Sequence, residues 1–179
     1  MKCTIVATIL LGLFLAPALA DKNKLTKKIS IPGGSQTLTV DKEWRVATLE
    51  QKSNQGSWKT VWNYDTGFIA SKVLPERACY ISIMNRKKMP NFDALPRLAE
   101  QNNSLKGHGH TSKDITFTLI KRPIRDLKSY GPDIFSMCRG LPTYVAYEYN
   151  GPQYGISSCK RLDAMQILGL RYCHANIKA

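Results

Sequence analysis

Acidic residues and histidines are scarce in this chain. Its 179 residues include 13 Asp and Glu and 3 His, against 26 Lys and Arg. Beyond the first 20 residues there is no apolar run of the roughly 20 residues that a membrane-spanning helix needs, no internal repeat, and no Gly-x-Ser-x-Gly motif. The sequence therefore predicts a chain that does not span a membrane, and it gives no support to serine hydrolase chemistry.

The first 20 residues have the features of a secretory signal peptide. Lys2 gives a positive start, residues 5–15 are apolar, and Ala18 and Ala20 form the small-x-small pattern that signal peptidase recognises. We expect cleavage before Asp21. An uncleaved anchor is the competing interpretation, but the apolar run is shorter than a membrane span requires. The sequence thus predicts a secreted, extracellular protein.

What remains, residues 21–179, is strongly basic. Only Lys2 of the 26 Lys and Arg residues lies in the leader, which holds none of the 13 acidic residues, so the net charge falls from +13 to +12. Such a charge attracts nucleic acid, anionic lipid, bacterial surfaces and acidic glycans without selecting among them. A merely solvated basic surface is the alternative. The length is enough for one domain with a sizeable core.

Removal of the leader leaves an even number of cysteines. Cys3 is lost, and Cys79, Cys138, Cys159 and Cys173 remain. An even count in a secreted chain predicts disulfides, and four cysteines allow three pairings, among which spacing gives only a preference for first with second and third with fourth. A zinc site is the alternative, but no two of them have the two-to-four-residue spacing of zinc motifs. We expect no metal and no cofactor.

Alternating apolar and polar residues predict β-strands through much of the chain. The clearest signal is a hairpin, in which residues 58–64 alternate, the Asp-Thr-Gly of residues 65–67 suits a turn, and residues 68–73 return as the partner strand. Residues 79–84 form a further strand. The lysine-rich start, residues 21–35, instead indicates a loosely held amino-terminal arm. Other β-prone segments are residues 38–40, 44–49, 115–119, 144–149, 154–159 and 167–173.

Two helices are also predicted. In the segment 91–101 the apolar side chains would lie on one side of a helix. Asp93 as cap with Pro96 in the first turn avoids the cost, about 3 kcal/mol, of a proline inside a helix. The second helix begins with the Gly-Pro pair at residues 131–132 and ends before Gly140.

Polar residues and glycines in residues 102–112 predict an exposed loop that opens with a glycosylation sequon at Asn102. The loop also holds His108 and His110. A small secreted ribonuclease would need two histidines and a lysine converging on a phosphate, and His174 is the third candidate. Two histidines one residue apart in a glycine-rich loop do not indicate an acid and a base on opposite sides of a bond, so we do not predict an enzyme.

Three segments resemble the BRICHOS domain. They read WKTVWNYDTGFIASKVLPERACYISIM at residues 58–84, NFDAL at residues 91–95 and MCRGLPTY at residues 137–144. Within that superfamily the chain is similar to the gastrokines, whose leader and tail cysteines it shares. The resemblance therefore covers nearly the whole chain.

The resemblance implies both a fold and a disulfide pattern. Cys79 and Cys138 would form the BRICHOS disulfide, which leaves Cys159 and Cys173 to each other. The implied fold is α+β, a disulfide-stapled central β-sheet flanked by two helices with additional C-terminal strands. The implied segments are a signal peptide (1–20), an N-terminal arm with leading strands (21–51), the BRICHOS domain (52–145) and a C-terminal β-rich segment with the second disulfide (146–179).

Two positions depart from the family pattern. Asn63 stands where the family has a near-invariant aspartate, and since an asparagine cannot ionise, a pH response that depends on that carboxylate should be absent or altered here. The simpler interpretation is that Asn63 hydrogen-bonds within the sheet. Trp58 stands where some gastrokines have an extra cysteine, so covalent pairing through that position is impossible.

A BRICHOS domain of this kind implies a non-enzymatic protein that shields β-prone segments from aggregation. As a gastrokine it would support gastric mucosal integrity and restrain epithelial proliferation, and its partners would be β-prone peptide or protein clients, or an epithelial surface receptor. The mechanism would be strand capture at an open sheet edge or on an apolar face. Tyr80, Met84 and Ile120 are candidate contacts, although the same alternation is typical of core residues.

A cationic mucus- or microbe-binding protein is the alternative from a different class. Its partners would be acidic mucus components or bacterial envelopes. The basic residues gather at residues 22–28 and at Lys121, Arg122 and Arg125, and are otherwise scattered. Specific recognition of nucleic acid has no support in this pattern.

Overall fold

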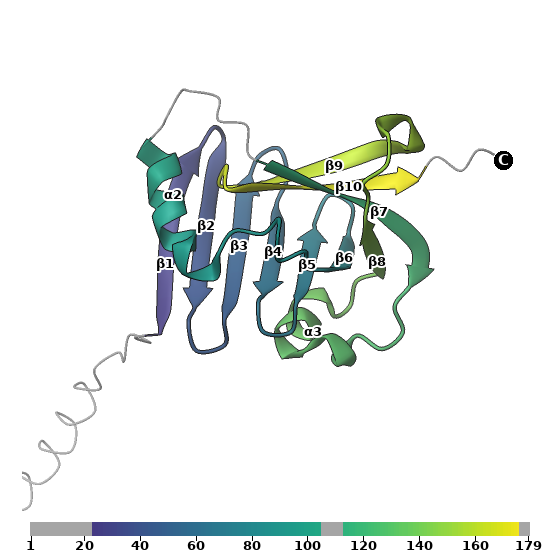
Figure 1. Ribbon diagram of the computed structural model, residues 1–179, viewed down its shortest axis with the longest axis horizontal. Coiled ribbons are helices and arrows are strands. Elements are labelled where there is room, and N and C mark those ends of the chain that lie inside the picture. The colour runs from purple at the N-terminus through teal and green to yellow at the C-terminus, as the bar shows by residue number, and fades with distance from the viewer. Residues whose placement is uncertain (1–22, 105–112, 176–179) are drawn as a thin grey trace, which may run out of the picture.

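The computed structural model describes residues 23–104 and 113–175 (Figure 1). These residues form one ten-stranded sheet in the order β1-β2-β3-β4-β5-β6-β8-β7-β10-β9. Its strands are β1 (Lys24–Ile31), β2 (Gly34–Asp41), β3 (Val46–Ser53), β4 (Trp58–Asn63), β5 (Phe68–Val73), β6 (Ala78–Ile83), β7 (Lys113–Pro123), β8 (Thr143–Glu148), β9 (Ile156–Ala164) and β10 (Leu168–Ala175). The helical elements are η1 (Phe92–Ala94), α2 (Leu95–Ser104), η2 (Lys128–Tyr130), α3 (Pro132–Cys138) and η3 (Gln153–Gly155). The fold is mostly β, with a smaller helical share than the expected α+β class implies.

The predicted hairpin is confirmed as β4 and β5. Trp58 pairs with Val73 and Asn63 pairs with Phe68, in one antiparallel register. The turn needs a positive φ at Gly67, which has φ 77°, a conformation that glycine adopts without steric cost. The alternation and the Asp-Thr-Gly turn in the sequence were therefore the right signals for this pair of strands.

The prediction of a loose amino-terminal arm is wrong for residues 24–31. They form β1, which pairs with β2 along its whole length, from Lys24 with Asp41 to Ile31 with Gly34. Every second residue, Leu25 among them, is half-buried, while the residues between are exposed. The lysines belong to an edge strand, where charge is common because it discourages pairing with other chains.

The sheet curls, so that β7, β9 and β10 cross over one face of β3 to β6 (Figure 1). We call this the inner face. The Tyr172 ring of β10 stacks on Phe117 at 5.3 Å and on Tyr80 at 5.0 Å between ring centroids. The Tyr172 hydroxyl donates to Ser71 Oγ, and Ser71 Oγ donates to Thr60 Oγ1. Each of these hydrogen bonds is 2.8 Å long. These bonds satisfy the buried hydroxyls and join the last strand to the central hairpin.

The two ends of the chain meet across the inner face. Buried Gln36 of β2 donates to the carbonyl oxygen of Asp163 at 2.7 Å and accepts from the N–H of Met165 at 2.8 Å. Leu38 and Leu168, from the two ends, lie in one hydrophobic cluster with the central strands. The leading strands and the C-terminal strands thus share one core with the middle of the chain.

The first helix covers the inner face at β1 and β2. Leu95 and Ala99 of α2 are buried in the main core cluster. The N-cap is Asn91, whose side chain accepts from the N–H of Asp93 and opens η1, so the prediction of Asp93 as cap is wrong. Pro96 lies in the first turn of α2, as predicted. The helix continues to Ser104, past the expected start of the loop, and residues 105–112 lie outside the described residues.

Candidate binding surface

The second helix, α3, lies on the opposite, outer face of the sheet. Its Ile134 and Cys138 are fully buried in a cluster with Val61 and Ile81, and a disulfide joins Cys138 to Cys79 of β6. The loop closed by this bond spans 59 residues, which corresponds to about 4 kcal/mol of stabilisation in the chain-entropy model. The disulfide therefore holds the C-terminal end of α3 against the sheet.

Asn63 holds the other end of α3. Its Nδ2 donates to Asp133 Oδ2 over 3.0 Å, and Asp133 lies in the first turn of α3. The Oδ1 of Asn63 accepts hydrogen bonds from the N–H groups of Asp65 and Thr66 at 3.0 and 2.8 Å. The amide thus serves as donor and acceptor at once, which an ionised aspartate could not do. The expected hydrogen bonding of Asn63 extends beyond the sheet to the helix.

Beyond α3 the outer face is apolar, and no helix of residues 23–104 and 113–175 covers it. We define the outer groove by Ile83, Ile120, Val145 and Tyr147, which come from neighbouring strands β6, β7 and β8. Ile83 is 71% exposed, Tyr147 52% and Ile120 46%. Ile81 of β6 pairs with Val145 of β8. Ile83 and Tyr147 each follow two residues later in their strands, so their side chains lie on the same face of the sheet. Two hollows of roughly 660 and 580 Å³ meet here and share Val145 and Tyr147.

The groove has an aromatic wall and a polar end. Tyr130 of η2 lines both hollows and packs edge-on against Phe68, with 5.0 Å between ring centroids. At the end of β8, Lys88 and Asn85 donate to Glu148. The hydrogen bond from Lys88 is the main cause that lowers the pKa of Glu148 below its ordinary value. The outer groove is thus an apolar recess closed at one end by an ion pair.

Of the three predicted contact residues, Ile120 lies in the groove and Met84 lines its first hollow, whereas Tyr80 does neither. Tyr80 and Met84 are 4% and 5% exposed and belong to the core. Burial is the main cause that raises the pKa of Tyr80, with a further contribution from its hydrogen bond to Glu76. Ile83 lies on the other side of β6 from Tyr80 and is 71% exposed.

The second disulfide lies at the opposite edge of the sheet. It joins Cys159 of β9 to Cys173 of β10, where the register shifts between Tyr172 and His174. Both disulfides therefore follow the pairing that the family resemblance implies. Ser158, beside the shift, has a positive φ of 47°.

Other predicted site residues are not brought together. Asn102 donates from its side-chain amide to the carbonyl oxygen of Met165 at 3.1 Å, so glycosylation there would compete with a packing contact. His174 is exposed on β10, while His108 and His110 lie outside the described residues. The histidine arrangement that a ribonuclease would need is not among the described residues.

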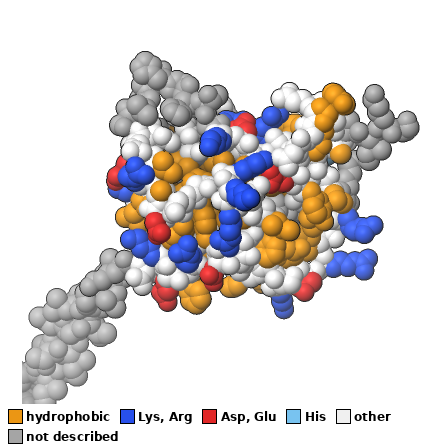
Figure 2. All heavy atoms as spheres, viewed as in Figure 1, with side chains coloured by type: hydrophobic (Ala, Val, Ile, Leu, Met, Phe, Trp, Pro, Cys, Tyr) orange, Lys and Arg blue, Asp and Glu red, His pale blue; other side chains and the backbone are white. Residues whose placement is uncertain are grey.

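Basic side chains occur on several parts of the surface. Figure 2 shows Lys and Arg scattered over one face, with few acids and with hydrophobic groups between them. Of the expected basic cluster, Arg122 lines the second hollow of the outer groove and Arg125 is exposed. Within residues 23–104 and 113–175, no helix is long and apolar enough to cross a membrane, and no group of three metal-binding side chains occurs.

Comparisons with known proteins agree with this architecture. The BRICHOS domain is matched over residues 54–145. Human gastrokine-1 is 32% identical over 180 residues, covering 97% of each chain. Mouse gastrokine-1 is 29% identical with 99% of each chain covered, and mouse gastrokine-3 is 30% identical, covering 97% of this chain and 92% of its own. No solved structure matches.

A disulfide-linked sheet with this domain over more than half of the chain defines a BRICHOS protein. The chain belongs to the gastrokine family. Identities to gastrokines 1, 2 and 3 all lie between 25% and 32%, so they do not select one member.

Proposed function

We propose that this chain is a secreted, non-enzymatic gastrokine that binds β-prone segments of other proteins in the outer groove. The observation that supports this proposal is the exposure of Ile83, Ile120 and Tyr147 on three neighbouring strands of one sheet. Exposed apolar patches of this kind on a soluble domain are typical of interaction sites. The client would be an extended segment whose alternate apolar side chains enter the two hollows.

The sheet edges are less suitable for capture. One edge is β1, which carries Lys24, Lys27 and Lys28, and the other is β9, which bends at Ser158 beside its disulfide. Lysines and bulges on edge strands discourage pairing with another chain. The face of the sheet therefore supports client binding better than either edge does.

The position of α3 explains why the groove stays open. The helix is only seven residues long, and both ends are fixed, by Cys138 and by Asp133. It covers Val61 and Ile81 but does not reach Ile83. A client can therefore bind beside α3 without displacing it.

The physiological part of the proposal follows from family membership. We infer secretion after cleavage before Asp21, and a role in gastric mucosal integrity and in restraint of epithelial proliferation. Shielding of aggregation-prone segments at an epithelial surface is compatible with both roles. An epithelial receptor could bind through the same groove.

The test uses oxidised residues 21–179 at a sub-stoichiometric ratio to an amyloid-forming peptide, with fibril growth followed by dye fluorescence. The double variant Ile83→Ser, Tyr147→Ser should shorten the delay several-fold. Both side chains are exposed, so the variant should fold with little loss of stability, because surface substitutions usually change it by about 0.5 kcal/mol or less.

A matched control removes one aliphatic and one aromatic side chain elsewhere. Leu74 and Tyr154 are 47% and 80% exposed, and the variant Leu74→Ser, Tyr154→Ser should delay fibrils as the parent does. Equal loss in both variants would reject the groove as the site. No delay by the folded parent would reject client binding and leave a receptor or mucus component as the partner class.

A further inference from the structure

Four lysines form a strip across the outer face, on the far side of α3 from the outer groove. We define the lysine strip as Lys28, Lys52, Lys59 and Lys72, from β1, β3, β4 and β5. Lys28 pairs with Thr37, Thr37 with Glu50, Glu50 with Lys59 and Lys59 with Lys72. Strands lie about 4.8 Å apart, so the strip extends about 19 Å across the strands.

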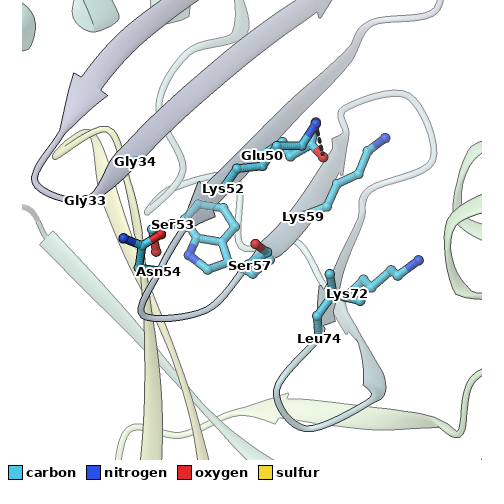
Figure 3. A pocket seen from close by; sticks show the side chains of 11 residues that line it. Gly33, Gly34, Glu50, Lys52, Ser53, Asn54, Ser57, Lys59, Lys72 and Leu74 are labelled. Carbon is cyan, nitrogen blue, oxygen red and sulfur yellow. Dashed lines mark ion pairs between the residues drawn. The ribbon is translucent and has the colours of Figure 1, made fainter.

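The strip contains an unfavourable pair of like charges. Lys59 and Lys72 are direct cross-strand partners, and like charges in this position destabilise a sheet. The acid in this row, Glu50, is paired with Lys52, with 3.5 Å between Nζ and Oε1. Figure 3 shows Lys59 and Lys72 projecting to the same side from adjacent strands, while Lys52 reaches Glu50. No acid of the described residues pairs with Lys59 or Lys72.

Neutral hydrogen-bonding groups complete a recess beside these ammonium groups. A hollow of roughly 530 Å³ is lined by Lys52, Lys59 and Lys72 together with Ser53, Asn54 and Ser57 (Figure 3). The Ser53 hydroxyl already donates to the carbonyl oxygen of Gly56 at 2.8 Å and accepts from Gln51 Nε2 at 3.2 Å. The Ser57 hydroxyl and the Asn54 amide can bond to the hydroxyls and ring oxygens of a sugar. The ammonium groups can bond to its acidic substituents, because hydrogen bonds between ionised groups are the stronger ones.

We propose that the lysine strip binds a sulfated polysaccharide chain that runs across β1 to β5. The retained Lys59–Lys72 repulsion is relieved when a sulfate group lies between the two ammonium groups. The chain then continues over Glu50 towards Lys28, while its sugar hydroxyls face Asn54 and Ser57. The site is independent of client capture, since α3 separates it from the outer groove.

Two other polyanions fit this surface less well. Single-stranded nucleic acid is held by exposed aromatic side chains on which bases stack, and Trp58, the aromatic residue in the recess, is only 5% exposed. A flat anionic bilayer would not reach Asn54 and Ser57 inside the hollow. A flexible chain with both acidic and hydroxyl groups reaches all of them.

The experiment measures binding of residues 21–179 to heparin by titration at several salt concentrations. The double variant Lys59→Gln, Lys72→Gln should weaken binding about threefold to tenfold, as expected for two exposed charge contacts, and should lessen the salt dependence. The same variant should melt at an equal or higher temperature, because the like-charge pair is gone. The control Lys42→Gln, Lys87→Gln removes the same charge from two exposed lysines outside the strip.

A further variant distinguishes binding of a polysaccharide chain from binding of a single sulfate ion. Lys28→Gln should weaken heparin binding but leave the weak binding of inorganic sulfate unchanged, since Lys28 does not line the hollow. Equal weakening by the control variant would overturn the proposal, because net charge alone would then explain binding. Tighter binding to single-stranded DNA or to anionic vesicles than to heparin would overturn the choice of partner. Both of these results would leave the proposed client binding in the outer groove untouched, because the fibril assay tests that proposal separately.

Discussion

Replacing Asn63 with aspartate tests how α3 is held to the sheet. In this chain Asn63 Nδ2 donates to Asp133 Oδ2 at 3.0 Å. In Asn63→Asp the turn at Asp65 and Thr66 keeps its acceptor, but an oxygen now faces Asp133. Two like charges about 3 Å apart repel by about 5 kcal/mol at an effective dielectric constant of 20. Asp133 is half-buried rather than fully buried, so we expect a net loss of about 1 to 3 kcal/mol at pH 7.

The loss depends on pH in a definite direction. The two carboxyl groups of the variant can share one proton, which the folded pair retains to higher pH than an isolated carboxyl does. The unfolded chain gives up its protons near pH 4, so above that pH it binds fewer protons than the folded state. The variant therefore loses stability as the pH rises from about 4, and the loss levels off once the shared proton has left.

Urea unfolding at pH 4 and pH 7 measures this effect, with the double exchange Asn63→Asp, Asp133→Asn as control. The exchange restores one donor and one acceptor to the pair, so it should recover most of the lost stability at pH 7. In thermal unfolding the single variant should melt about 3 to 9 °C lower at pH 7. Unchanged stability at pH 7, or an exchange variant no more stable than the single one, would refute this account of α3.

Two further predictions concern the disulfide and the groove. Cys79→Ser, Cys138→Ser opens a loop of 59 residues and should lower the free energy of unfolding in urea by about 4 kcal/mol; a loss below about 1 kcal/mol would contradict it. Glu148→Gln should cost about 0.5 to 1 kcal/mol at pH 7. Lys88 lowers the pKa of Glu148 in the folded protein. The contribution of Glu148 to stability is therefore complete above its pKa in the unfolded chain, and it is lost as the pH falls through its pKa in the folded protein. The variant and the parent should therefore converge in acid, and a difference that persists there would point to packing instead.

Local patterns in the sequence predicted the parts of the fold that depend on neighbouring residues. The β4–β5 hairpin follows from alternation around Gly67, and α3 from the Gly-Pro pair at its start, with Gly131 as N-cap and Pro132 as first residue. The error at β1 arose because its lysines suggested a solvated arm. Ile29 and Ile31 alternate with polar residues there, in register with Leu25, and that period of two was the signal for a strand.

The binding surfaces depend on contacts between distant segments, which the sequence alone did not reveal. The outer groove exists because β8 lies between β6 and β7, an order that joins Ile83, Tyr147 and Ile120 although they are far apart in the chain. The lysine strip depends less on contacts between distant segments. Once the hairpin register is known, Lys59 and Lys72 must oppose each other, but their meaning as a site depends on the missing acid partners and on the hollow beside them.

Asn63 connects these surfaces, because it fixes the helix that lies between them. An aspartate in its place would need a shared proton to keep Asp133 close, so the position of α3 would respond to pH. The amide of Asn63 donates to Asp133 whether that carboxyl is ionised or protonated, since both forms contain an acceptor oxygen. In this chain α3 should therefore keep its place from acidic to neutral pH. The outer groove would then be available to clients over that whole range without a proton-dependent opening step.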